Sequence, residues 1–170
     1  MTNRALLDII TEMKISSKIK TEIVEALKNN LGYRFKACVL FGSVARSVAH
    51  EKSDIDLLVV TKGLSKNTVK RRSLIQAALT EVRNKLKRDI SIVDFELREF
   101  EDVTPLLINI AHDGVILYDK DRKITKLFDK IRKAVKKAGL VRYYTPTGKY
   151  GWKPIRPLKR GERIVVKLEE

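Results

Sequence analysis

The sequence predicts an α/β protein of the α+β kind, in which helices flank a small mixed β-sheet. Three observations support this fold class. Short apolar runs typical of buried strands alternate with longer segments of helical periodicity. One helical segment joins two of the strands, as in a βαβ unit, and strands joined in that way lie parallel. The 170 residues suffice for one domain, or for one domain with an appendage.

The N-terminal part of the chain predicts two amphipathic helices that cover the sheet. The first spans residues 3–14, and Ser16 and Ser17 then break the pattern and cap the start of the second helix. The apolar faces of these helices are formed by Leu6, Leu7, Ile10 and Met13 in the first and by Ile19, Ile23, Leu27 and Leu31 in the second.

The middle of the chain predicts the strands and the crossover helix. Strands are expected over residues 33–41, from Asp54 to Thr61 and over 89–95, with one long helix over 66–86 between the last two. The outer face of that helix is expected to carry Lys70, Arg71, Arg72, Arg83 and Lys87. Further on, we expect a helix over 103–111, a strand over 115–118 and a final helix ending at Gly139.

The most informative stretch lies between the first two strands. Phe41-Gly42-Ser43-Val44-Ala45-Arg46 is followed, after the spacer that ends at Ser53, by Asp54-Ile55-Asp56-Leu57-Leu58. Strand side chains alternate, so the two aspartates point to the same side, and two converging carboxylates suit a Mg²⁺ ion between them. Gly42 permits a close approach of backbone to a ligand, and Ser43 offers donors to an anion. Phosphate donors beside an acid pair indicate phosphoryl or nucleotidyl chemistry.

This combined motif resembles the DNA polymerase β-like nucleotidyltransferase superfamily, most closely its minimal nucleotidyltransferase branch. The family pattern is an apolar residue, Gly-Ser, a spacer, and Asp-apolar-Asp-apolar, and here it lies within residues 35–118. One departure is Ser47, which stands where the family commonly has glycine. The resemblance implies a polymerase β-like fold and an enzyme that binds a nucleoside triphosphate, ATP first among them, with two Mg²⁺ ions. Such an enzyme transfers a nucleoside monophosphate to a hydroxyl and releases pyrophosphate.

The resemblance also implies roles for particular residues. Gly42 and Ser43 are expected on the triphosphate, and Asp54 and Asp56 are expected to hold the metal ions. Arg46 stands where it could meet phosphate oxygens, although it could equally be an ordinary surface charge.

The family usually supplies a third carboxylate from the third strand, and we assign it to Asp89. It would bind metal and take the proton of the attacking hydroxyl as a general base. A different strand register would put Ser91 at this position, which would remove the third acid and put full two-metal catalysis in doubt. Asp94 has the wrong parity to point at the site.

Charge is concentrated at the C-terminal end of the chain. The formal net charge is +15, and residues 120–170 hold 17 Lys or Arg against 5 Asp or Glu, which is +12 of that total. We divide the chain into a nucleotidyltransferase domain over 1–139 and a basic, aromatic extension over 140–170. The extension could bind nucleic acid by stacking bases among cations, or pack on the domain and add an edge strand over 163–168.

Two further functions remain open. The chain could be a non-catalytic, antitoxin-type partner of a helical HEPN-like protein, as minimal nucleotidyltransferases often are, or a nucleic-acid-binding protein that uses the fold as a scaffold. Cys38 is the only cysteine, no signal-peptide pattern occurs, and no apolar run reaches the ~18 residues of a membrane span. We therefore expect a cytoplasmic protein without a membrane partner.

Overall fold

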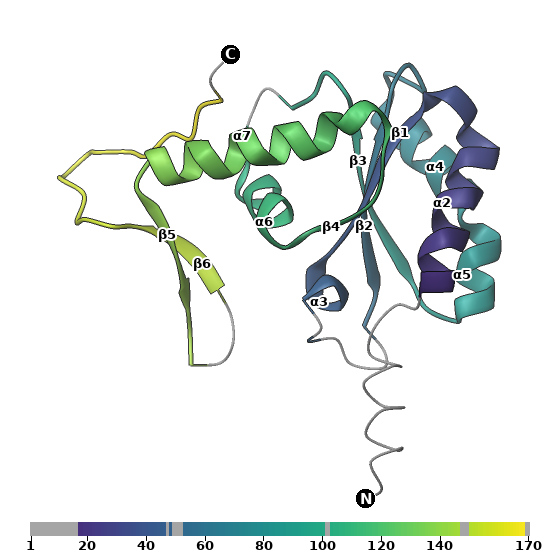
Figure 1. The fold of residues 1–170 in the computed structure, drawn as a ribbon, viewed down its shortest axis with the longest axis horizontal. Coiled ribbons are helices and arrows are strands. Elements are labelled where there is room, and N and C mark those ends of the chain that lie inside the picture. Colours follow the sequence, from purple (N-terminus) through teal and green to yellow (C-terminus); the bar gives the residue numbers. More distant parts are fainter. Residues whose placement is uncertain (1–16, 47, 49–52, 101–102, 147–149, 169–170) are drawn as a thin grey trace, which may run out of the picture.

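The computed structural model describes residues 17–46, 48, 53–100, 103–146 and 150–168 (Figure 1). The helix expected over residues 3–14 and the family departure at Ser47 lie outside the described residues. Helix α2 spans Ser17–Leu31, in agreement with the second predicted helix. None of the helices in the described ranges is long and apolar enough to cross a lipid bilayer.

Four strands form the mixed sheet that the sequence predicts, in the order β3-β2-β1-β4. Strand β1 (Phe35–Phe41) pairs antiparallel with β2 (Ile55–Thr61) and with β4 (Val115–Asp119). Strand β3 (Ile90–Glu96) runs parallel to β2, as expected for two strands joined by a crossover helix. The predicted fold class, a small mixed sheet flanked by helices, is confirmed.

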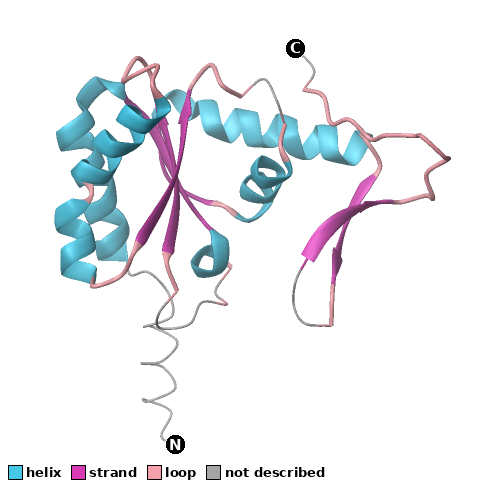
Figure 2. Ribbon diagram, turned by 180° about the vertical axis from the view of Figure 1, so that it is seen from behind, coloured by secondary structure: helices cyan, strands magenta, loops and turns pink. Residues whose placement is uncertain are grey.

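Helices cover both faces of this sheet (Figures 1 and 2). Helices α4 (Thr68–Ala78) and α5 (Thr80–Leu86) lie with α2 on one face, and α6 (Pro105–Asp113) and α7 (Lys123–Lys137) lie on the other. The central strands contribute alternate residues to two apolar clusters: Cys38, Leu40, Leu57 and Val59 face α2, α4 and α5, and Ala37, Val39, Leu58 and Val60 face α6 and α7.

The crossover between β2 and β3 is two helices where the sequence predicts one. Helix α4 ends at Ala78, and Leu79 leaves helical geometry with φ −102° and ψ 3° before α5 begins at Thr80. The Thr80 hydroxyl donates to the carbonyl of Gln76 at 3.2 Å and so competes for an acceptor of the helix ladder. A hydroxyl that bonds back to the preceding turn bends a helix, which accounts for the break.

Arg71 corrects a second expectation, because it is buried against β3 and does not lie on the outer face of its helix. Its side chain is 1% exposed, and its Nε donates to Asp94 Oδ2 at 2.7 Å. Its Nη2 donates to Glu99 Oε2 at 2.8 Å. Arg72 donates to the other oxygen of Asp94 at 2.9 Å. Charge pairing makes this burial tolerable, since a lone buried guanidinium would lose its hydration without compensation.

The C-terminal segment begins with a two-stranded antiparallel hairpin, β5 (Leu140–Tyr144) and β6 (Tyr150–Pro154), separate from the main sheet. Trp152 of this hairpin donates from Nε1 to Asn109 Oδ1 on α6 at 2.8 Å and packs at the edge of the α6/α7 cluster. The chain then runs on beside α7 without regular structure. The expected edge strand over 163–168 is wrong, because these residues pair with no strand of either sheet.

Candidate active site

The strand register places Asp56 at the centre of the candidate site. In β2 it lies opposite Phe41 of β1 on one side and opposite Ser91 of β3 on the other. Phe41 is the last residue of β1, so the single-turn helix α3 (Gly42–Ala45) begins directly beside Asp56. The pairing of β1 with β2 therefore brings the Gly-Ser turn and the second motif aspartate together.

Gly42 and Asp56 are in intimate contact. Gly42 has φ +74°, and a Cβ atom built on it would lie only 2.0 Å from Asp56 Oδ2. Both facts exclude other residues, since L side chains disfavour this left-handed conformation and the carboxylate already fills the space. The turn thus needs glycine in order to accommodate the aspartate, a reason that the sequence motif alone does not reveal.

The two aspartates differ in their surroundings. Asp54 is exposed, whereas Asp56 is half-buried. Burial raises the pKa of Asp56 above its ordinary value, and the charge of Asp54 raises it further, while Arg46 and a hydrogen bond from Ser91 act in the opposite direction. A carboxylate held next to another negative charge in this way is stabilised by a cation.

The third strand brings Ser91, and not an acid, against Asp56. Ser91 is both the register partner of Asp56 and its hydrogen-bond donor. Asp89 lies two residues before Ser91 on the same face and is exposed. Its backbone carbonyl accepts a hydrogen bond from the Ile55 N–H at 2.9 Å. Its side chain borders a shallow cavity of about 270 Å³ together with basic residues of the α5–β3 connection. The assignment of Asp89 as third acid stays a prediction.

The aspartate pair fits a divalent cation, Mg²⁺ above all. Magnesium is commonly held by one or two carboxylates and completes its shell with water and substrate phosphates, and Asp54 and Asp56 offer two such carboxylates. Burial, and after it the neighbouring charge of Asp54, raises the pKa of Asp56, and a bound cation would offset both effects. Among the described residues, no group of three or more His, Cys, Asp or Glu side chains that could hold a metal occurs.

Arg46 and a residue from the far end of the chain complete the surroundings of the turn. The exposed Arg46 follows α3, and its Nη1 donates to the hydroxyl of Tyr150 at 3.1 Å. Both side chains border a cavity of about 170 Å³ that also reaches Gly42 and Asp113. The sequence places Tyr150 only within an aromatic tail, because no local pattern links residues that lie 104 positions apart.

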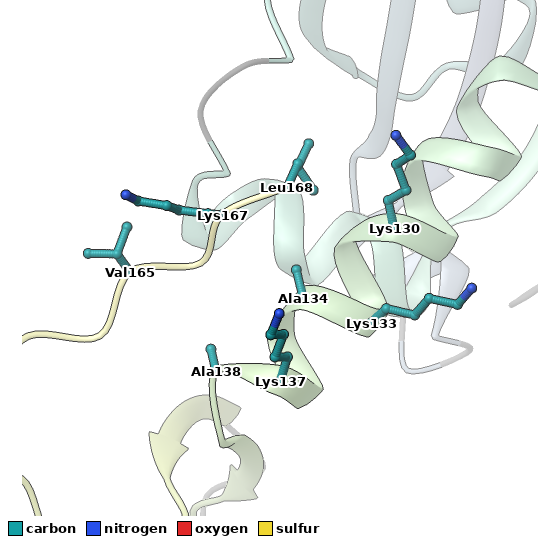
Figure 3. Close-up of a pocket in the computed structure, with 8 residues that line it drawn as sticks. All are labelled: Lys130, Lys133, Ala134, Lys137, Ala138, Val165, Lys167 and Leu168. Atoms are coloured by element: carbon teal, nitrogen blue, oxygen red, sulfur yellow. The ribbon is translucent and has the colours of Figure 1, made fainter. Parts of the chain in front are cut away.

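A larger pocket lies elsewhere, between α7 and the C-terminal segment (Figure 3). It measures about 710 Å³ and is bordered by alanine, valine and leucine side chains and by lysines of both elements. Its position, remote from the motif residues, makes it a separate surface of the protein. The lysines that border it are Lys130, Lys133, Lys137 and Lys167.

Comparison with known proteins agrees with this geometry. The model of the family described as "Polymerase beta, Nucleotidyltransferase" matches residues 21–123, which is more than half of the chain. The chain belongs to this nucleotidyltransferase family. It is therefore an enzyme of the transferase class, and the predicted resemblance to the polymerase β-like superfamily is confirmed.

Proteins similar to this nucleotidyltransferase are known, both by sequence and by structure. A protein of Methanocaldococcus jannaschii, with the provisional name protein adenylyltransferase, is 29% identical over 126 residues, which cover 73% of this chain and 86% of that protein. A crystal structure described as a toxin–antitoxin with AMP-PNP has a TM-score of 0.51 at 19% identity, over 69% of this chain and 87% of the other. A variant of the toxin–antitoxin MntA-HpeT scores 0.50 at 21% identity, over 69% and 86%. These structural likenesses show the fold.

Nucleotidyltransferases of this family use a nucleoside triphosphate and divalent metal ions. When bound here, a metal ion held by Asp54 and Asp56 would neutralise charge on the triphosphate and on the attacking and leaving oxygens. The residues of the chain then have simpler tasks: Gly42 gives the carboxylate room, and Ser91 holds its orientation by a hydrogen bond.

Proposed function

We propose that this nucleotidyltransferase is a protein adenylyltransferase, which moves AMP from ATP·Mg²⁺ onto a hydroxyl of a partner protein. The observation that carries the proposal is the packing of the Asp56 carboxylate between the Gly-Ser turn and Ser91, with Asp54 on the same face. The name of the M. jannaschii relative supports AMP and a protein acceptor. A helical, HEPN-like protein is the partner that the minimal nucleotidyltransferase resemblance favours, and the cytoplasm is the predicted location.

The proposed reaction is an in-line exchange at the α-phosphorus of ATP. The acceptor oxygen forms a bond to the phosphorus, the bond to the bridging oxygen of the β-phosphate breaks, and pyrophosphate leaves with that electron pair. Ser43 and Arg46 bind phosphate oxygens, Asp54 and Asp56 hold the metal, and the hydroxyl proton passes to Asp89 as general base.

Transfer of label from α-labelled ATP in the presence of Mg²⁺ tests the proposal. The acceptors are the total protein of the source cells and, where one is encoded beside this chain, a small helical protein; the labelled products are then treated with protease and with ribonuclease. We expect label on protein, and at least a ~10²-fold lower rate when Asp54 and Asp56 are both changed to alanine. Asp129→Asn is the matched control, because Asp129 is an exposed aspartate on α7 away from the site. Transfer that survives the double substitution would end the assignment.

The role of Asp89 has its own test. We expect Asp89→Asn to lower the rate of transfer ~10²- to 10⁴-fold with little change in nucleotide affinity, since general-base assistance contributes in that range. A rate within a few fold of the unsubstituted enzyme would show that two acids suffice and that Ser91 occupies the third position.

The lysine-bordered pocket beside α7 favours a second candidate function, in which the acceptor is an RNA end. Lysines from α7 and from the C-terminal segment surround a partly apolar surface (Figure 3), which suits phosphates together with stacked bases. This candidate predicts RNA binding that weakens steeply with salt and a label that ribonuclease removes. Lys133→Glu combined with Lys167→Glu should weaken that binding, whereas Lys66→Glu, an exposed lysine near α4 on the opposite face, should change it less.

A further inference from the structure

The β5–β6 hairpin lies outside residues 21–123, the part of the chain that the family model matches, yet one of its side chains reaches the Gly-Ser turn. Tyr150, the first residue of β6, accepts a hydrogen bond from Arg46 Nη1 at 3.1 Å. The guanidinium carbon of Arg46 lies 5.0 Å from the centroid of the Tyr150 ring, within the range of a cation–π contact. The hairpin therefore holds the arginine of the motif by two contacts.

Tyr150 is itself held in place by side chains of α6 and β5. It hydrogen-bonds to Asp113, the last residue of α6, which also accepts two hydrogen bonds from Arg142 of β5. The side chains of Asp113 and Arg142 are only 13% and 19% exposed, and the Arg142 guanidinium lies 4.0 Å over the Tyr150 ring. A paired and largely buried anchor of this kind restricts the position of the Tyr150 hydroxyl.

A second anchor ties the hairpin to α6. Trp152 lies on the same face of β6 as Tyr150, donates to Asn109 at 2.8 Å, and packs its ring against His112 with centroids 4.5 Å apart. Arg46, by contrast, is exposed and follows a helix of a single turn. The rigid part of the contact is thus the hairpin, and the part that it orders is Arg46.

We propose that Tyr150 is a positioning residue of the nucleotide site, which holds the Arg46 guanidinium beside Gly42 and Asp56 so that it meets the phosphates of the substrate. The hairpin is in that case a working part of the active site. The cavity of about 170 Å³ bordered by Gly42, Arg46, Tyr150 and Asp113 lets a ligand reach both side chains of the contact. The inference rests on the phosphate-binding role proposed for Arg46.

The positive charge of Arg46 affects two carboxyl groups, Asp56 and Asp113. It opposes the rise in the pKa of Asp56 in β2 and contributes to the lowered pKa of Asp113 at the end of α6. Arg46 borders the same cavity as Gly42 and Asp113, so it lies between the Gly-Ser turn and the hairpin anchor. A phosphate arriving beside the two aspartates would therefore find a guanidinium already in place.

Removal of a single hydroxyl tests the inference. Tyr150→Phe keeps the ring that stacks on Arg46 and Arg142 and removes only the atom that bonds Arg46 and Asp113. We expect a ~10-fold increase in the KM for ATP and in the Kd for ATP·Mg²⁺ measured by calorimetry, with kcat within ~3-fold, because one hydrogen bond to a charged group is lost. Tyr143→Phe is the matched control, since Tyr143 lies on the opposite face of the hairpin, and it should change both constants less than ~2-fold.

A double-mutant cycle separates positioning from a structural role. If Tyr150 acts through Arg46, then Tyr150→Phe should change the Kd less than ~2-fold in an Arg46→Ala background. If the two substitutions raise the Kd by independent factors that multiply, or if Tyr150→Phe alone leaves the Kd unchanged, the inference is overturned. Thermal unfolding of each variant should stay within a few degrees of the unsubstituted protein.

The binding measurement also separates this inference from the proposed function. An enzyme that binds ATP·Mg²⁺, loses affinity in Tyr150→Phe and yet labels no protein would contradict the adenylyltransferase proposal and support the role of the hairpin. Labelling of protein with an unchanged Kd in Tyr150→Phe would do the reverse. A chain that binds no nucleotide would overturn both.

Discussion

Gly42→Ala is the substitution that tests most directly how the turn and the aspartate depend on each other. The added Cβ would lie 2.0 Å from Asp56 Oδ2 and 2.9 Å from its Cγ, so the carboxylate must move. Gly63→Ala is the natural comparison, because Gly63 has a similar φ of +68° but nothing within 4 Å of the added atom. The pair separates the backbone cost from the cost of displacing Asp56.

The expected energies follow from these two geometries. A non-glycine residue in the left-handed region costs about 1–2 kcal/mol, and alanine recovers about 0.4–1 kcal/mol through the unfolded chain. Gly63→Ala should therefore lower the free energy of unfolding by roughly 1 kcal/mol. Gly42→Ala adds the cost of forcing the Asp56 side chain off its rotamer, about 0.5–1.5 kcal/mol, for a total near 2 kcal/mol.

Urea unfolding followed by circular dichroism measures the difference, which corresponds to about 2–4 °C in Tm for a chain of this size. The same two proteins are then assayed for nucleotidyl transfer. Because the displaced carboxylate is a predicted metal ligand, Gly42→Ala should lose ~10²-fold or more in rate, while Gly63→Ala should retain full activity. Equal stability of the two variants, or an active Gly42→Ala enzyme, would show that Asp56 does not depend on the glycine.

Three further predictions concern buried and paired charges. Arg71→Ala should lower the free energy of unfolding by about 3–5 kcal/mol in urea titration, because Asp94 and Glu99 both lose the buried guanidinium and Asp94 keeps only the exposed Arg72. Arg72→Ala, which removes that exposed partner, should cost less than about 1 kcal/mol. The hydrogen bonds from Arg142 keep the pKa of Asp113 below its ordinary value, so this carboxyl contributes stability above an unfolded pKa near ~4, and that stability is lost as pH falls through the lower folded value. The Tm of Asp113→Asn should therefore vary less with pH over that acidic range. The pKa of Asp56 is raised, so the stability that this carboxyl contributes is present below its unfolded pKa and is lost as pH rises through the higher folded pKa. Asp56→Asn should therefore be more stable than the unsubstituted protein at pH 7 while transfer is abolished, and a lower Tm would contradict this.

Periodicity and strand parity predicted most of what positions the candidate site. The apolar runs gave β1 and β2 to within a few residues, and alternation put Asp54 and Asp56 on one face. These features could be read from the sequence because they depend on residues one or two positions apart. The parallel pairing of β2 with β3 followed from the length and periodicity of the connection between them.

What the sequence could not provide are the contacts between distant charged or polar residues. Arg71 was expected outside because arginine is rarely buried, and only the acids of β3 and the following turn, 23 and 28 positions away, make its burial tolerable. Tyr150 lies 104 positions from Arg46, in a tail where aromatic and basic residues alternate without a distinctive pattern. In both cases the side chain gains its role from a partner that local patterns do not identify.

The two faces of β3 show how structural and chemical charges are kept apart in this nucleotidyltransferase. Asp94 and Glu96 are buried on the α4 face, where Arg71 and Arg72 pair with Asp94, while Ser91 points to the opposite face and meets Asp56. A slip of one residue in β3 would carry each side chain to the other face and would separate Asp94 from its arginines. The buried ion pair therefore penalises a one-residue slip of β3 away from the register that sets Ser91 opposite Asp56. A charge network on the α4 face thus helps to determine which residue of β3 faces Asp56, the predicted metal ligand.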